Sequence, residues 1–494
     1  MIVTQEQAFL KAHQQLQSLI AFVQQAPQQR LRLDQVERGV FTLLLQLGLS
    51  LPQAHVAAAG NGDAGETVTT ADGHVHRRLP APHARTYRSI FGELPIQRFV
   101  YGSREGQAIT HVPLDATLGL PAGEFSYVLE DWCQRMCVQN AFHESVRSLH
   151  DLLGVRPSVR SLEQMNQTLG DAAADFAWQK PAPPPEEEGA VLVVTADGKG
   201  VPMCRPEEAP PSVHRRRKKG EKANKKQMAY VGAVYTIAPW VRTAEDVVDE
   251  VRSRQRAQGR PLPQHKQVWA EMTTIAEGEA INGRSVLFGM LAETAAQRSP
   301  AGSKPVICLM DGETALWDEC QVWFDGAVGI LDLFHVLERL WAVAHCFHSE
   351  GSEAAGEFVT ERLRMLLNGK VGAVIEGLRH MVTKNGLKGQ RRQTVQRATG
   401  YFANNRERMR YDEYLAAGYP IGSGVAEGAC RHVVKDRLER AGMRWTVTGA
   451  QAMLRVRAVY VNGDWEAFLE KRIQTEQQRL YGSRDQEAEL GLAV

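Results

Sequence analysis

The chain has 494 residues, which corresponds to about three domains at roughly 150 residues each. Hydrophobic residues make up 43% and charged residues 23%, as in an ordinary globular protein, so the composition excludes wholesale disorder and fibrous repeats. No stretch approaches the roughly 18 consecutive apolar residues of a membrane helix, and we expect no membrane partner. The net charge is only +1, which by itself argues against a nucleic-acid partner.

The distribution of charge is uneven along the chain. Residues 1–190 carry 15 Lys/Arg and 20 Asp/Glu, whereas residues 191–494 carry 43 and 37. Eight basic residues and one Glu lie in 214–226, and nineteen basic against seven acidic residues lie in 362–457. Because local charge decides what a surface attracts, these segments favour a polyanionic partner.

The seven cysteines are odd in number and scattered, which is typical of reduced thiols in a cytosolic protein. Cys133 and Cys137 have no second Cys or His pair nearby, so we interpret them as structural thiols on one helix face. The group His345, Cys346 and His348 also fits a helix face better than a zinc site. The N-terminus lacks the basic start and apolar core of a signal peptide, so we expect a cytoplasmic protein.

The N-terminal third is predicted to be mainly helical. Residues 1–83 form a first region, with two helices within 5–50 and a Gly-rich loop over 56–74. Residues 84–180 form a second region, with a β-hairpin over 85–102 around GELP and three helices within 126–170. A stop at Gly154 and a new start at Pro157 and Ser158 fit a DNA-binding helix-turn-helix, and a plain helical hairpin fits equally well.

A linker over 181–189 (PAPPPEEEG) separates this part from an α/β region. Short apolar, β-branched runs are typical of buried strands, and they alternate with helical patterns over 190–349, which predicts a mixed sheet flanked by helices. The expected strands are 190–196, 228–238, 267–272, 306–310 and 328–333, and the expected helices are 285–297, 313–323 and 334–347. A basic helical insertion (350–415), a second part of the core (416–464) and a tail (465–494) follow.

Two aspartates follow apolar strand patterns directly. Asp197 comes after VLVVTA and Asp311 after VICLM, each followed by Gly. Carboxylates held on such a rigid platform suit a hard divalent cation, although Asp also ends strands by forming turns or capping helices. Adjacent strands would bring the two together. Asp332 is the main rival to Asp311, which has the better strand context.

Glu427 is the candidate for a third carboxylate. It lies near the start of a helix that carries Arg431, Lys435 and Arg437, which favours a site for phosphates, although the helix dipole also favours a Glu there. Three carboxylates could hold two Mg²⁺ (or Mn²⁺) ions about 3.5–4 Å apart, which would stabilise the attacking and leaving oxygens of a displacement at phosphorus.

These motifs resemble a known family. The strand order with Asp197, Asp311 and a late Glu427 resembles the RNase H-like core of DDE transposases. The segments TADGKGVPM, CLMDGETALW, DLFHVLERLW, GYPIGSGVAEGACRHVVKDRL and RWT closely resemble the ISKra group of bacterial insertion-sequence transposases, over about 191–460. The resemblance implies that the three carboxylates are the catalytic, metal-binding triad. It also implies that the helical insertion lies between the second Asp and the Glu, as in Mutator-like elements.

Several other residues are candidates for contact with DNA or for support of the site. Asp332 and His335 match a family position, and we interpret them as supporting the metal ligands or facing DNA, with a plain core role as the alternative. Trp445 could stack on a displaced base or be buried. The cations expected to contact the DNA backbone, rather than to be merely solvated, are Arg215, Arg216, Arg217, Lys218, Lys219, Lys222, Arg391, Arg392, Arg431, Lys435 and Arg437.

The sequence therefore predicts a metal-dependent DNA transposase that binds terminal inverted repeats, cleaves a strand and transfers its 3′ end. A homodimer or larger assembly on double-stranded DNA is expected, associated with the nucleoid when bound. A nuclease of the same fold that does not join strands, and a DNA-binding protein without enzymatic activity, are the alternatives.

Overall fold

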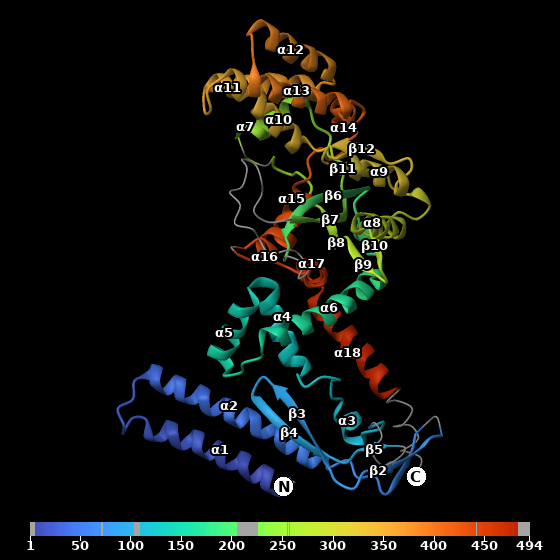
Figure 1. Cartoon of the computed structure of the whole chain (residues 1–494). Helices are drawn as coiled ribbons and strands as arrows, with labels where there is room; N and C mark the ends of the chain where they lie inside the picture. Colours follow the sequence, from blue (N-terminus) through green and yellow to red (C-terminus); the bar gives the residue numbers. More distant parts are fainter. Residues whose placement is uncertain are drawn as a thin grey trace, which may run out of the picture. The chain divides into compact units, whose positions relative to one another are not determined.

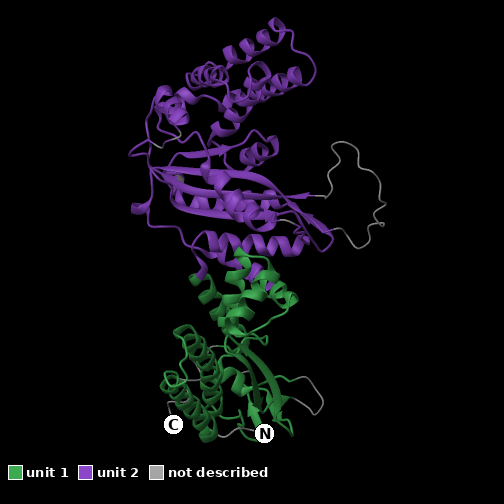
Figure 2. Ribbon diagram, turned by 90° about the vertical axis from the view of Figure 1, so that its left-hand side faces the viewer, with its two compact units in different colours: residues 1–166, 466–494 green, residues 167–465 purple. Residues whose placement is uncertain are grey.

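The computed structural model describes residues 5–482 apart from 71–72, 103–108, 205–225, 254, 256 and 441, and gives only the backbone at Ala301. The chain divides into two compact units, shown in two colours in Figure 2. One comprises residues 1–166 and 466–494, and the other comprises residues 167–465.

The first unit begins with two helices that pack against each other, α1 (Gln5–Gln25) and α2 (Leu33–Ala58) (Figure 1). Both helices were expected from their apolar spacing. Among the described residues, α2 is the one helix long and apolar enough to cross a membrane by length and composition. A core helix of a soluble protein can have the same length and composition, so this one helix does not by itself indicate a membrane span.

The expected β-hairpin is present as β3 (His83–Ser89) and β4 (Gly92–Arg98), with Arg85 opposite Ile96. Its turn lies at residues 90–91, so GELP begins the second strand instead of forming the turn. Gly92 has a φ of 124°, which favours glycine at that position. A separate three-stranded sheet is formed by β1 (Thr67–Thr69), β2 (Val75–Arg78) and β5 (Tyr101–Gly102).

Helices complete the first unit. They are α3 (Pro113–Leu118), α4 (Tyr127–Gln139), α5 (Phe142–Leu153), the start of α6 (Val159–Gln179) and α18 (Trp465–Tyr481). Gly154 ends α5 in the left-handed conformation and the Ser158 hydroxyl accepts a hydrogen bond from the Ser161 amide, so the expected stop and start are confirmed. Cys133 and Cys137 are both buried on α4.

The second unit is built on a five-stranded mixed sheet in the order β12-β11-β6-β7-β8 (Figure 1). β6, β7 and β8 are antiparallel neighbours, whereas β11 and β12 run parallel to β6. The expected mixed α/β architecture is therefore confirmed. The strands are β6 (Val191–Pro202), β7 (Lys226–Ile237), β8 (Gln264–Met272), β11 (Val306–Met310) and β12 (Val328–Leu331).

Helices cover both faces of this sheet, which explains why its strands are continuously apolar. Val191 and Val193 belong to a core shared with α10 and the helical insertion, while Leu192 and Val194 belong to a core shared with α8 and α9. The flanking helices are α7 (Ala244–Ser253), α8 (Gly283–Arg298), α9 (Thr314–Trp323) and α10 (Leu333–Phe347). A small hairpin is formed by β9 (Thr274–Ala276) and β10 (Glu279–Ile281).

The first strand of the core is longer than expected. β6 runs for 12 residues and Asp197 pairs with Val231 in its interior, so the expectation that Asp197 ends the strand is wrong. The strand continues through the glycines because β7 accompanies it over its whole length. A Cβ on Gly198 would lie 2.7 Å from the Met228 methyl, so a side chain at this position would displace the end of the Met228 side chain.

The insertion is helical, as expected, with α11 (Glu353–Leu367), α12 (Val371–Lys384), α13 (Gly389–Asn404) and α14 (Tyr411–Ala416). The last part of the unit comprises α15 (Gly424–Ala429), a π-helical stretch (Cys430–Lys435), α16 (Asp436–Leu438) and α17 (Val447–Val461). Short 3₁₀ turns lie at Pro185–Glu187, Pro300–Gly302 and Arg406–Arg408.

The end of the acidic linker is tied to the sheet unit by a buried ion pair. Glu188 accepts a hydrogen bond of 2.6 Å from Arg298, and both side chains are 1% exposed. Lys304 adds a second contact to Glu188 at 2.9 Å.

Candidate metal and nucleic-acid site

When the strand register is extended, three aspartates fall at one level of the neighbouring strands β6, β11 and β12. Cys308 on β11 pairs with Val194 on β6, and continuing this register by three residues places Asp311 beside Asp197. Met310 pairs with Leu331 on β12, so the next pair along is Asp311 and Asp332. Asp197 therefore lies within β6, and Asp311 and Asp332 directly follow β11 and β12.

The pleat of the sheet also sets the direction of these side chains. Alternate residues of a strand face the same side. Asp197 therefore lies on the same face as Val193, and Asp311 on the same face as Leu309. Val193 and Leu309 both belong to the core on the α10 side of the sheet. Both carboxylates consequently face the side of the sheet that carries α10 and α15.

A buried serine positions the helix that carries Glu427. The hydroxyl of Ser423 accepts a hydrogen bond from the Ala426 amide and lies 2.7 Å from the hydroxyl of Thr195 on β6. The Ser423 amide donates to the Asp332 carboxylate at 3.2 Å. These contacts fix the first turn of α15 against β6 and the start of α10, so Glu427 is held near Asp332.

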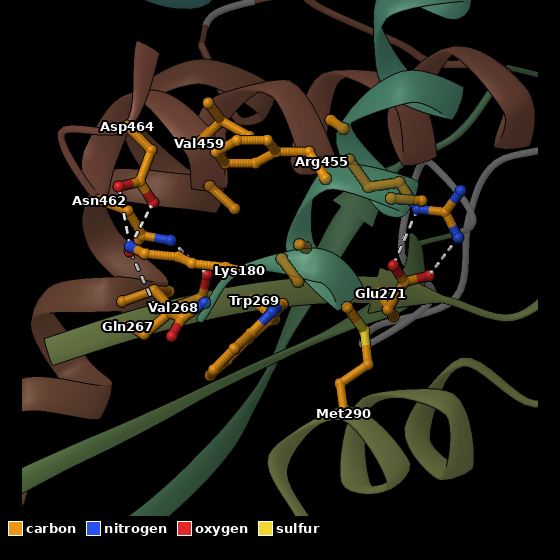
Figure 3. Close-up of a pocket in the computed structure, with 16 residues that line it drawn as sticks. Lys180, Gln267, Val268, Trp269, Glu271, Met290, Arg455, Val459, Asn462 and Asp464 are labelled. Carbon is orange, nitrogen blue, oxygen red and sulfur yellow. Dashed lines mark hydrogen bonds and ion pairs between the residues drawn. The ribbon is translucent and has the colours of Figure 1, made fainter. Parts of the chain in front are cut away.

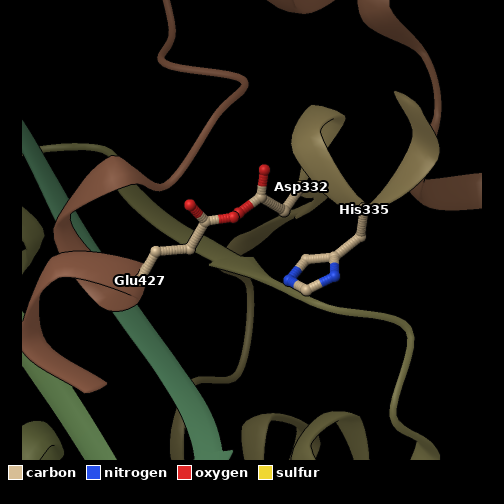
Figure 4. A group of neighbouring side chains, drawn as sticks. All are labelled: Asp332, His335 and Glu427. Carbon is tan, nitrogen blue, oxygen red and sulfur yellow. The ribbon is translucent and has the colours of Figure 1, made fainter. Parts of the chain in front are cut away.

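Asp332, His335 and Glu427 form a compact group of possible metal ligands (Figure 4). One ligand atom from each lies within 4.8 Å of the others. In the view shown, the Asp332 and Glu427 carboxylates point toward each other and the His335 ring lies beside them. Asp332 is 2% exposed and also caps α10 by accepting a hydrogen bond from the Phe334 amide at 2.9 Å.

His335 connects this group to the predicted triad. Its Nδ1 lies 3.9 Å from the Asp311 carboxylate and 3.7 Å from that of Glu338. Asp197 and Asp311 themselves are not members of the 4.8 Å group, which contains only Glu427 of the predicted triad. Thus, of the predicted triad, only Glu427 belongs to the group of possible metal ligands found among the described residues, together with Asp332 and His335.

Two further side chains join the site that the sequence did not indicate. The Tyr401 hydroxyl, from α13 of the insertion, donates to Asp311 Oδ1 at 2.6 Å. Glu313, just before α9, interacts electrostatically with both Asp197 and Asp311. Glu313 could have been found from its position in the DGE segment, whereas Tyr401 lies 90 residues from its partner and has no local signal.

The crowding of carboxylates affects their protonation. Burial, and secondarily the charges of Glu338 and Asp197, raise the pKa of Glu427 above its ordinary value. Burial raises the pKa of Asp332 to about 6, and burial with the nearby aspartates raises that of Glu313. Burial and the neighbouring Asp197 also raise the pKa of the Cys430 thiol. Like charges this close oppose ionisation, which a bound cation would relieve.

The donors fit a divalent cation. Carboxylate oxygens are the ligands preferred by Mg²⁺, and a set of carboxylates with one imidazole is also compatible with Mn²⁺. Both Asp332 oxygens already accept backbone N–H groups, which fixes the orientation of that carboxylate.

The predicted DNA-binding residues fall into three groups. Those of the basic run, from Arg215 to Lys222, lie outside the described residues. Arg391, Arg392, Arg431 and Lys435 are exposed. Arg437 is fully buried and lies over the Trp445 ring at 4.9 Å, so its predicted role in DNA contact is wrong.

Trp445 is buried as well, in agreement with the alternative to a stacking role. It is 7% exposed, and its indole N–H donates to the Leu438 carbonyl at 3.2 Å. Arg437 and Trp445 therefore pack together as part of the core beneath the α15–α16 region. The charge of Arg437 is stabilised by the aromatic face instead of by solvent.

A cavity elsewhere in this unit is too small to bind a ligand (Figure 3). It lies among α6, β8 and α17 and has a volume of about 20 Å³, which is room for about one water molecule. Its charged side chains are paired, Lys180 with Asp464 at 2.7 Å and Arg455 with Glu271 at 2.8 Å. These pairs hold the segments around α17 together. The aspartates near Glu427 are therefore the better candidate site.

Comparisons with known proteins add little to this description. No model of a known protein family matches the chain, and no curated protein matches it. Among solved structures, the chain is similar to the Drosophila P element transposase strand transfer complex, with 10% sequence identity and a TM-score of 0.22. The match covers 73% of this chain and 85% of the other. A similarity of this size carries no argument about function.

Proposed function

We propose that this chain is a metal-dependent DNA transposase with an RNase H-like core and a catalytic triad of Asp197, Asp311 and Glu427. The observation that supports the proposal is the register of β6 and β11, which if continued would set Asp197 beside Asp311, on the face where Ser423 holds Glu427. The motifs that resemble the ISKra group contain these three residues, and the position of the insertion between Asp311 and Glu427 supports the same assignment.

The proposed chemistry is a pair of displacements at phosphorus. In the first, water attacks the phosphorus at an element end, and the bond to the 3′ oxygen breaks to leave a free 3′-hydroxyl. In the second, this hydroxyl attacks a phosphorus of target DNA and displaces the 3′ oxygen of the target strand. When bound, Mg²⁺ or Mn²⁺ lowers the pKa of the nucleophile and offsets charge on the leaving oxygen, and two ions are proposed.

The residues of the chain have separate roles in this scheme. Asp197, Asp311 and Glu427 would hold the ions. Asp332 would position Glu427 through Ser423, and His335, between Asp311 and Glu427, would either complete the ligand set or orient the carboxylates. The exposed Arg391 and Arg392 of the insertion would contact the DNA backbone without reading its sequence.

The test is a cleavage and joining assay with the full chain. The substrate is duplex DNA taken from either side of the coding sequence, supplied with Mg²⁺ or Mn²⁺, and the products are 3′-hydroxyl ends and joined strands. We expect Asp197→Asn, Asp311→Asn and Glu427→Gln each to reduce cleavage by at least about 100-fold, because each removes a charged ligand.

Asp318→Asn is the matched control. Asp318 is exposed on α9 in the same unit and should keep cleavage within about twofold of the parent protein. Retained cleavage in the Asp197 or Glu427 variant would refute the catalytic assignment. Cleavage without joining of pre-cleaved ends would instead identify a nuclease, and specific DNA binding with no cleavage would identify a binding protein. Cross-linking on end DNA tests the proposed dimer or larger assembly.

A further inference from the structure

A cleft with two arginines opens beside the acidic site. It lies between α10 and α13, has a volume of about 420 Å³, and is lined by Arg339, Ala342, Thr394, Arg397, Ala398 and Tyr401. Its size is far above the roughly 30 Å³ that one water occupies in the liquid, so it has room for a group such as a phosphate with its sugar.

Among the residues that the structure describes, the two arginines of the cleft have no acidic partner. Arg339 and Arg397 are both exposed, and within the described part of the chain neither forms an ion pair with a carboxylate. Arg339 lies over the Tyr401 ring at 5.1 Å, and the Arg397 guanidinium donates a long hydrogen bond of 3.4 Å to the carbonyl of Gln393. Two guanidinium groups without acidic partners across one cleft offer a multidentate site for a phosphate.

Tyr401 joins the cleft to the acidic site. Its ring lines the cleft, while its hydroxyl donates to Asp311 at 2.6 Å and accepts from the Gly312 amide at 3.1 Å. The cations and the carboxylates are therefore separated by one tyrosine side chain. Successive phosphates on one DNA strand advance by only about 3.4 Å along a duplex axis, so a strand cleaved at Asp311 would place a neighbouring phosphate near this cleft.

We propose that the cleft between α10 and α13 binds a phosphodiester of the DNA strand next to the cleaved bond, with Arg339 and Arg397 as its ligands. The inference rests on the proposed transposase function and adds to it a defined position for the DNA backbone. Ala342, Ala398 and the Tyr401 ring would form the apolar wall against which the sugar packs.

The first experiment measures DNA affinity of the full chain as a function of salt. The probe is a fluorescein-labelled duplex of the flanking DNA, with Ca²⁺ in place of Mg²⁺ to prevent cleavage. We expect Arg339→Ala and Arg397→Ala each to weaken binding about three- to tenfold at about 0.1 M salt. Each should also make the dependence of log K on log salt shallower by about 1, since one phosphate contact is lost. Arg379→Ala, which removes an exposed arginine of α12 outside the cleft, should do neither.

The second experiment locates the phosphate. Neutral methylphosphonates replace single phosphates near the cleavage position, and one or two positions should weaken binding by the parent protein but not by Arg397→Ala. If no position behaves in this way, or if both cleft variants match Arg379→Ala, the cleft does not bind a phosphodiester, whether or not the parent protein cleaves DNA. If the cleft variants lose affinity as expected but the parent protein never cleaves, the phosphate site stands and the proposed enzymatic function fails.

Discussion

Replacement of Ser423 by alanine should destabilise the sheet unit and disturb the site together. The change removes the hydroxyl that caps α15, at a cost of about 1 kcal/mol. It also leaves the buried Thr195 hydroxyl without its partner at 2.7 Å, which costs about a further 1–3 kcal/mol. The expected total is about 3 kcal/mol, or roughly a 6 °C decrease in melting temperature at about 2 °C per kcal/mol for a unit of this size.

A double-mutant comparison separates the two contributions. Thr195→Val alone should cost about 1 kcal/mol, because Ser423 keeps its bond from the Ala426 amide. Added to Ser423→Ala, however, the same change removes the unpartnered hydroxyl and should recover about 1 kcal/mol. Thermal denaturation of the full chain measures all three variants. Thr446→Ala is the matched control, since Thr446 caps α17 at an exposed position and its loss should cost only about 1 kcal/mol. If the double variant is no more stable than Ser423→Ala, Ser423 does not hold α15 against β6 in the way described.

Three further changes test other parts of the structure. Gly312→Ala would place a Cβ 2.4 Å from the Tyr401 ring. We therefore expect thermal denaturation to show a loss of about 1–3 kcal/mol in stability, together with reduced cleavage. Unchanged stability and cleavage would show that Tyr401 is not fixed against Asp311. Glu188→Ala would leave Arg298 buried without its carboxylate and should lower the free energy of unfolding by about 3–5 kcal/mol. Glu186 is exposed, so Glu186→Ala should leave the stability unchanged. Equal effects of the two changes would contradict a buried ion pair. Burial raises the pKa of Glu130 to about 7 despite its contact with Arg472 at 2.8 Å. The folded state then holds the proton more tightly than the unfolded state, so stability should fall by on the order of 3 kcal/mol as pH rises from about 4.5 to 7. Glu130→Gln should flatten this dependence in melting curves recorded across that pH range, and an identical slope in both proteins would exclude Glu130 as its source.

The mixed sheet of the second unit followed from local sequence patterns. A strand covered on both faces must be apolar at every position, and such a run is visible in VLVVTA and VICLM without knowledge of any partner. The extension of β6 beyond Asp197 could not be seen in the same way. It depends on pairing with β7 and on Gly198 leaving room for Met228, both of which are contacts between residues distant in sequence.

The same limit explains the errors within the site. A charged side chain such as that of Arg437 usually indicates an exposed position on a helix. Arg437 is buried instead, with its guanidinium over the Trp445 ring. Tyr401 lies in a helix whose pattern indicates packing alone, and its role depends on the return of α13 to the end of β11. His335 was identified as part of the site through its family position, but its proximity to both Asp311 and Glu427 required the structure.

The helical insertion is therefore part of the site and not an appendage to it. Residues from α11, α12 and α13 belong to the same buried core as Leu309 and Ile330 on the α10 side of the sheet. Tyr401 from the same insertion carries the hydrogen bond that orients Asp311, and the chain that leaves the insertion forms the Ser423 cap that holds Glu427. Any motion of α13 would consequently shift one predicted metal ligand directly and the phosphate cleft with it. An insertion that both binds the DNA backbone and holds Asp311 would couple correct placement of the strand to assembly of the metal site.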